Sequence, residues 1–176
     1  MRVIEELTSL MAGRGQQNYG ENVTIAEHVL LTAAAAERVG CSESVIAACL
    51  LHDVGHWLDE PDDDFGIHSH AGSGGMWVAK HFDLDVSEPV RLHVDAKRYL
   101  CTVDSGYYHC LSEASKYTLT QQNGLMTEEE VNVFLANPHH QDAITLRKIE
   151  DKYGKRTGVS IPKFEHFHSL LEKLVK

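Results

Sequence analysis

Histidines and carboxylates in this chain occur in patterns that suit metal binding. The chain has 176 residues, and 12 of them are histidines. The clearest pattern is His52-Asp53, which follows the apolar pair Leu50-Leu51 and precedes Val54-Gly55-His56. An imidazole nitrogen and a carboxylate oxygen at the end of a packed helix can reach the same metal ion. The pair therefore indicates a metal site at the exit of a buried helix.

Further candidate ligands lie before and after this pair. His28 precedes it, His70 and His93 follow it, and Asp151 lies near the C-terminal end. A lone histidine on a helix is more often a surface or core residue, and Asp151 within a run of charges is by default a solvated carboxylate. The whole set runs in the order histidine, histidine-aspartate, two histidines and a late aspartate. This order favours one shared metal site.

Helices must position these residues, because helical periodicity dominates the sequence. No stretch alternates apolar and polar residues long enough to indicate a strand, so we expect an all-α fold. Thr24 and Glu27 have the spacing of a capping box, which places His28 in the first turn of a helix. The expected helices cover about residues 3–11, 24–39, 42–51, 70–82, 112–121, 127–136, 140–153 and 164–176, with another that begins near residue 87.

The composition excludes several classes of protein. Sixteen Lys and Arg residues against 26 Asp and Glu give a net charge of −10, which repels nucleic acid and anionic membranes. No apolar run approaches the ~20 residues of a membrane span. The four cysteines form no CxxC pair, and the first residues do not resemble a signal peptide. We therefore expect one cytoplasmic domain over residues 1–176, without a nucleic-acid or membrane partner. The sequence does not determine the oligomeric state.

Several longer segments add a more specific pattern to the candidate ligands. The most specific segment runs from His93 to Leu100 and reads His-Val-Asp-Ala-Lys-Arg-Tyr-Leu. The other segments are Tyr19-Gly20-Glu21, Glu27-His28, Leu50 to His56, Leu111 to Leu119, Asp151 to Lys155, Pro162 and Glu165-His166. In these segments the sequence resembles the HD-domain superfamily and, within it, the PhnZ-type mixed-valent di-iron oxygenases.

The resemblance implies a helical HD fold that holds two iron ions in the mixed-valent Fe(II)/Fe(III) state. It implies that Asp53 bridges the ions, with these further ligands: His28, His52 and Asp151 on one iron, and His70 and His93 on the other. The assignment of Asp151 rests on the match to Asp-x-x-Gly-Lys, and Glu150 is the alternative. Imidazole and carboxylate also suit manganese, zinc and nickel, so the choice of iron comes from the resemblance.

The resemblance also implies a reaction, in which dioxygen cleaves the carbon–phosphorus bond of a small 1-hydroxyalkylphosphonate. The substrate would carry a 2-amino or 2-trimethylammonio group, and the products would be phosphate and glycine or glycine betaine. Lys97 lies four residues after His93, on the same helix face, where a cation could hold the phosphonate. The other implied phosphonate contacts are His56, Ser115, Thr118 and Lys148. Lys148 stands where an arginine is expected, which keeps the charge but loses the bidentate fork.

Tyr19 and Glu21 match a gate in the same family. There, a tyrosine of the N-terminal loop occupies an iron site before substrate binds, and a nearby glutamate holds it. One residue separates Tyr19 from Glu21, where two are expected, whereas the step of seven residues from Glu21 to His28 is kept. The resemblance therefore implies a gate formed by Tyr19 and Glu21.

Three other functions are compatible with the same ligands. An HD phosphohydrolase would act on a nucleotide or phosphomonoester through a metal-bound hydroxide, and it would need neither a redox metal nor Tyr19. A metal-stabilised sensor would keep the ligands but would not need Lys97, Ser115 and Thr118 as a set. An inositol-oxygenase-like enzyme would act on another polyol.

Overall fold

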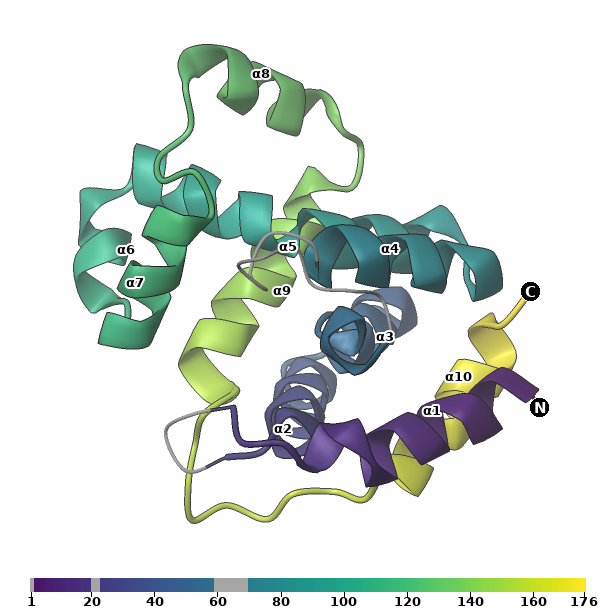
Figure 1. Cartoon of the computed structure of the whole chain (residues 1–176). Helices are drawn as coiled ribbons and strands as arrows, with labels where there is room; N and C mark the ends of the chain where they lie inside the picture. Colours follow the sequence, from purple (N-terminus) through teal and green to yellow (C-terminus); the bar gives the residue numbers. More distant parts are fainter. Residues whose placement is uncertain (1, 20–22, 59–69) are drawn as a thin grey trace.

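The computed structural model describes residues 2–19, 23–58 and 70–176, and this part of the chain contains no β-strand. The all-α prediction is therefore confirmed (Figure 1). The α-helices are α1 (Arg2–Ala12), α2 (Ile25–Arg38), α3 (Glu43–Leu51), α4 (His70–His81), α5 (Leu84–Val103), α6 (Ser105–Cys110), α7 (Glu113–Gln121), α8 (Glu128–Ala136), α9 (His140–Tyr153) and α10 (His168–Leu174). Three short 3-10 helices are η1 (Arg14–Gln16), η2 (Val54–Trp57) and η3 (Phe164–Phe167).

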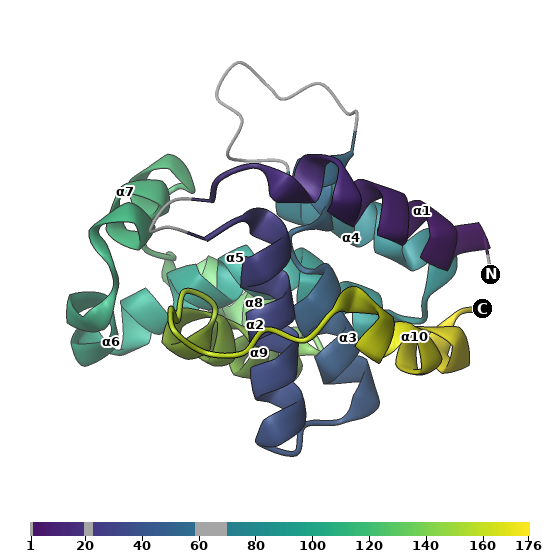
Figure 2. The ribbon, with the colours of Figure 1, turned by 90° about the horizontal axis from the view of Figure 1, so that it is seen from below.

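Helices α2, α3, α5 and α9 form the centre of the molecule. The 20-residue α5 packs against α3, α4 and α9, and α2 packs against α3 and α9. Figures 1 and 2 show α1 and α10 together at one end, near both termini, and α6 and α7 at the opposite end. The elements that carry His28, His52-Asp53, His70 and His93 therefore meet in the middle of the fold.

A capping box positions α2, and a run of buried residues positions α3. The Thr24 side chain accepts a hydrogen bond from the Glu27 backbone N–H at 3.1 Å, and the Thr24 N–H donates to the Glu27 carboxylate at 2.8 Å. His28 consequently lies in the first turn of α2, as predicted. Helix α3 is buried from Val45 to Leu51, so its end carries His52 and Asp53 into the interior.

One predicted boundary is wrong, and one helix was not predicted. Helix α5 begins at Leu84, one turn before residue 87, because the Asp83 carbonyl accepts from the N–H groups of Val86 and Ser87 at 3.1 and 3.0 Å. Val86 is buried in the core, and this burial outweighs the N–H that Pro89 lacks inside the helix. Helix α6 was not expected; it buries none of its residues, so no apolar periodicity marks it.

The helices found here include no candidate membrane span. Within the described residues, none is long and apolar enough to cross a bilayer.

The contact between η2 and α4 requires glycine at position 55. A Cβ atom built on Gly55 would lie 2.0 Å from the His70 backbone oxygen, far inside van der Waals contact. Gly74 reinforces this approach, since its own Cβ would lie 3.0 Å from the Gly55 nitrogen. The short distance brings η2, with His56, against the first residue of α4, which is His70.

We expect Gly55→Ala to lower the free energy of unfolding by about 1–3 kcal/mol, because the backbone of η2 or α4 must move. Urea unfolding measured by circular dichroism gives this value. Gly72→Ala is the matched control, because a Cβ there meets no atom within 4 Å and alanine favours the helix by up to about 1 kcal/mol. Equal unfolding free energies for the two variants would contradict the close contact.

Candidate metal centre and active site

Four buried histidines surround the carboxylate of Asp53. Its Oδ2 atom lies 3.6 Å from Nε2 of His28 and 3.4 Å from Nε2 of His52. Its Oδ1 atom lies 3.9 Å from Nε2 of His70 and 3.8 Å from Nε2 of His93. All five residues are buried, and they come from α2, the end of α3, α4 and α5. Each carboxylate oxygen therefore faces its own pair of buried imidazoles, and Nε2 of the less buried His56 also lies 3.9 Å from Oδ1.

This arrangement fits two metal ions that share Asp53. The ligand atoms of His28, His52 and Asp53 lie within 4.8 Å of one another, and so do those of Asp53, His70 and His93. Both Asp53 oxygens are buried and lack a hydrogen-bond partner among the described residues. A buried carboxylate without a partner is costly, and bound cations would remove that cost. The geometry thus supports a dinuclear site.

Three of the four histidines are oriented as metal ligands by backbone carbonyls. The Nδ1 atoms of His28, His52 and His93 donate to the carbonyls of Gly154, Cys49 and Val90 at 2.8, 2.8 and 2.7 Å. A carbonyl can only accept, so each Nδ1 carries the proton, and in the neutral ring the lone pair is on Nε2. The Nε2 atoms that point toward Asp53 are therefore the ones with a lone pair available to a metal ion, as in other histidine–metal sites.

Burial governs the protonation of these imidazoles. It lowers the pKa of His70 and His93 to about 3, with a further decrease from the neighbouring histidines, and it also lowers the pKa of His28. Burial alone would lower the pKa of His52 as well, but the adjacent Asp53 carboxylate outweighs it and raises that pKa to about 9. His28, His70 and His93 are consequently neutral at pH 7, which is the form that binds metal.

The structure separates the two carboxylates of α9. Glu150 is buried, and its oxygens lie 3.8 Å from His28 Nε2 and 4.0 Å from His52 Nε2. Asp151 instead accepts hydrogen bonds from the Arg147 guanidinium and the Tyr107 hydroxyl. Of the two, Glu150 is therefore the carboxylate beside the first pair of histidines, whereas the sequence favoured Asp151.

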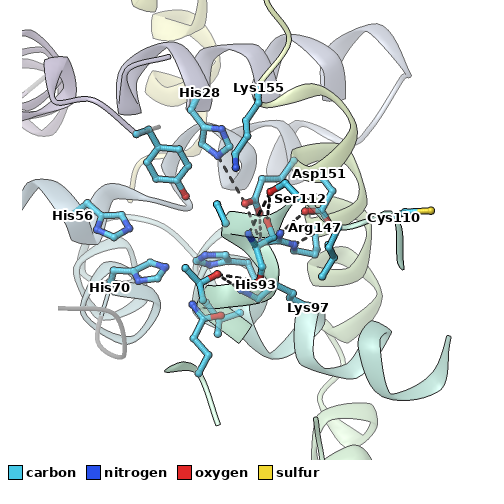
Figure 3. A pocket seen from close by; sticks show the side chains of 18 residues that line it. His28, His56, His70, His93, Lys97, Cys110, Ser112, Arg147, Asp151 and Lys155 are labelled. Atoms are coloured by element: carbon cyan, nitrogen blue, oxygen red, sulfur yellow. Dashed lines mark hydrogen bonds and ion pairs between the residues drawn. The ribbon is translucent and has the colours of Figure 1, made fainter. Parts of the chain in front are cut away.

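A pocket of about 370 Å³ lies beside the histidine cluster (Figure 3). It brings together four of the predicted phosphonate contacts, which are His56, Lys97, Ser115 and Thr118. The ammonium of Lys97 is buried and donates to the Thr118 hydroxyl at 2.9 Å. Burial and then the nearby Arg147 lower the Lys97 pKa to about 7. Binding of an anion beside it would favour the charged form.

Lys148 does not take part in this pocket, and the structure corrects that expectation. Lys148 is exposed and is not among the lining residues, because adjacent residues on a helix point about 100° apart. Arg147 lines the pocket, is buried, and donates to both Glu150 oxygens at 3.0 and 3.1 Å. Sequence reasoning missed Arg147, although its spacing of three residues from Glu150 places both on one helix face.

Tyr19 also reaches the pocket. Its ring stacks on His28, with ring centroids 4.4 Å apart and an angle of 26° between the planes. Burial and the carboxylates of Asp53 and Glu150 raise the Tyr19 pKa well above its usual value. Without a metal ion the residue is therefore a neutral phenol next to the cluster. The predicted partner, Glu21, lies outside the described residues.

Comparisons with known proteins agree with this geometry. The family model described as "HD domain" matches residues 25–118. The chain is 38% identical to a hydroxymethylphosphonate dioxygenase of Gimesia maris, over 98% of this chain and 88% of the relative. It is 37% identical to a [1-hydroxy-2-(trimethylamino)ethyl]phosphonate dioxygenase (glycine-betaine-forming) of Leisingera caerulea, over 98% of this chain and 90% of the relative. An uncharacterized mimivirus protein is 33% identical over 89% of this chain and 74% of its own length.

We expect the protein to bind two metal ions per chain, measured by inductively coupled plasma mass spectrometry after gel filtration. His93→Ala should reduce the content to about one ion, because only one pair of imidazoles loses a member. Asp53→Ala should reduce both ions, since each site uses one of its oxygens. His109→Ala, on an exposed residue of α6, is the control and should keep two. Two ions retained by both His93→Ala and Asp53→Ala would rule out this ligand set.

Proposed function

Because the chain belongs to the HD-domain family, we propose that it is an oxygenase that cleaves the carbon–phosphorus bond of a small 1-hydroxyalkylphosphonate. The observation that carries the proposal is the pocket between the Asp53 cluster and two buried cations, Lys97 and Arg147. A metal pair would face one side of this pocket, and groups that could bind an anion face another. The relatives similar over nearly the whole chain are both named as phosphonate dioxygenases, which supports this choice over the phosphohydrolase.

The proposed metals are two irons in a mixed-valent pair. Asp53 would bridge them, with the other ligands divided as follows: His28, His52 and Glu150 on one ion, and His70 and His93 on the other. We prefer Glu150 to Asp151 because its oxygens face His28 and His52, while Asp151 is occupied by Arg147 and Tyr107. When bound, the irons would activate dioxygen and supply the redox chemistry.

The residues of the pocket would bind and orient the phosphonate. Lys97 and Thr118 already contact each other at 2.9 Å, so an oxygen of the substrate could bind both. Ser115 and His56 add further donors, and Arg147 takes the role that the sequence gave to Lys148. The guanidinium of Arg147 is held on its other edges by Glu150 and Asp151, which fixes the direction of its remaining donors. Phosphonate would thus be held at a fixed distance from the metals.

The reaction requires one dioxygen for each phosphate. The overall balance is R–CH(OH)–PO3H2 plus O2, giving R–COOH and H3PO4, in which the C1–H and C–P bonds break and both electron pairs reduce dioxygen. No external reductant is consumed in this balance. A hydrolase on the same ligands would release phosphate without dioxygen.

This difference in stoichiometry tests the function. Protein from iron-supplied cells, mixed with 2-amino-1-hydroxyethylphosphonate, should consume dioxygen and release phosphate in equal amounts, measured by an oxygen electrode and a phosphate assay. It should also show the electron paramagnetic resonance signal of a spin-coupled Fe(II)/Fe(III) pair. Anaerobic samples and zinc-loaded protein serve as controls and should release no phosphate. Turnover of a phosphomonoester that is unaffected by removing dioxygen would support the phosphohydrolase instead.

The stacking of Tyr19 on His28 supports a second part of the proposal, a protective role for this phenol. An open ferrous site reacts with dioxygen unproductively, so a removable protein ligand would protect the resting enzyme. Tyr19 lines the pocket, and its loop follows η1 and precedes α2. Substrate that enters the same pocket would have to displace the ring.

We expect the iron-loaded protein to show a visible phenolate-to-iron charge-transfer band that fades when substrate is added. Tyr19→Phe should lack this band while it keeps both irons and part of its activity. The control is Tyr117→Phe, which should keep the band because Tyr117 lies on α7 and is 63% exposed. The gate is wrong if the resting di-iron protein has no band, or if Tyr19→Phe retains it.

A further inference from the structure

We propose that Tyr107 is a positioning residue of the phosphonate site: its hydroxyl fixes the Asp151 carboxylate, and this carboxylate aims the Arg147 guanidinium at the anion. This inference rests on the proposed function and adds to it a residue outside the pocket. Arg147 and Asp151 both line the pocket and lie side by side (Figure 3). Tyr107 is not among the described residues that line it, so it would act on the substrate through these two side chains.

Hydrogen bonds join the three side chains. The Tyr107 hydroxyl donates to Oδ2 of Asp151. Nε of Arg147 donates to the same oxygen at 3.0 Å, and Nη2 of Arg147 donates to Oδ1. Nε also lies 3.4 Å from the Tyr107 oxygen. Both carboxylate oxygens therefore bind one edge of the guanidinium, in the bidentate arrangement that is stronger and more directional than a single hydrogen bond.

The bond from Tyr107 ties this pair to a second helix. Glu150 and Asp151, the two carboxylates that bind Arg147, lie on α9 together with Arg147 itself. A pair within one helix fixes its partners relative to each other, but long side chains can still swing together between rotamers. Tyr107 lies on α6, so its hydroxyl holds Asp151 from a separate element. Without the hydroxyl, the Arg147–Asp151 pair should still form but should be less well oriented.

Tyr107 is itself anchored. Its ring packs against two buried apolar clusters, which include Leu100 of α5 and Leu119 of α7. Its backbone N–H donates to the carboxylate of Asp104, the N-cap residue of α6, at 3.2 Å. A tyrosine side chain has only two rotatable χ angles, so a packed ring also fixes its hydroxyl.

The orientation of Arg147 matters because a guanidinium binds anions in a fixed direction. Asp151 engages Nε and Nη2, and Nη1 donates to Glu150, so the donors left for a substrate lie on the terminal nitrogens. A planar fork binds two phosphonate oxygens only when these donors face them, whereas the point charge of Lys97 tolerates rotation. A rotated Arg147 would keep its charge in the pocket but would lose a contact with the anion.

The sign of one substitution distinguishes this role from a simpler one. A carboxylate that only lines an anion pocket repels the phosphonate, so Asp151→Asn would then tighten binding. A carboxylate that aims Arg147 has the opposite effect. The amide of asparagine has one oxygen, and its NH2 group would face an N–H of Arg147, so Asp151→Asn should weaken binding.

Anaerobic titration calorimetry on the metal-loaded protein tests the assignment, with hydroxymethylphosphonate and 2-amino-1-hydroxyethylphosphonate as ligands. Tyr107→Phe should weaken binding of both about fivefold, with KM raised more than kcat is lowered and with unchanged metal content. Asp151→Asn should weaken both about tenfold. Tyr108→Phe is the matched control and should bind like the wild type, since Tyr108 is the next residue on α6 and is 37% exposed.

A double variant separates positioning from a purely structural role. Arg147→Lys keeps the charge but has no fork for Asp151 to aim, so Tyr107→Phe should add little to it. Equal weakening by Tyr107→Phe in the wild type and in Arg147→Lys would mean that Tyr107 only supports the fold, which would overturn the assignment. If Arg147→Lys binds neither ligand, the sign of the Asp151→Asn effect decides.

Three further results would also overturn the assignment. Tighter binding of both ligands by Asp151→Asn would make Asp151 a simple repelling anion. A loss confined to the amino compound would mean that Asp151 binds its ammonium group. Wild-type binding that Tyr107→Phe leaves unchanged would reject the role of Tyr107 alone, whereas a wild-type protein that neither binds nor oxidises either phosphonate would reject the proposed function together with this inference.

Discussion

The fold is organised around a single carboxylate that has no hydrogen-bond partner in the described structure. Asp53 lies at the end of the apolar helix α3, with five imidazoles, four of them buried, around its two oxygens at 3.4 to 3.9 Å. A buried charge of this kind is tolerated when cations compensate it, so the metals would belong to the stability of the fold as well as to its chemistry. Backbone carbonyls of three separate segments hold the imidazoles in the ligating orientation.

Helix α9 connects the metal side of the pocket to the substrate side through Arg147. The guanidinium contacts Glu150, which faces the histidines, and Asp151, which is held by Tyr107 of α6. A change in one carboxylate would therefore move the cation that both share, and binding of phosphonate and of metal would be coupled. The short helix α6, which buries none of its residues, contributes to the site mainly through this one hydroxyl.

The sequence predicted the elements that carry the metal ligands well, because capping and apolar periodicity are local signals. It placed His28 in the first turn of α2 and His52-Asp53 at the end of α3, and both positions are observed. It could not separate Glu150 from Asp151, or Arg147 from Lys148, since neighbouring residues in a charged helical segment differ only in the direction they face. That direction is set by packing of α9 against α2 and α5.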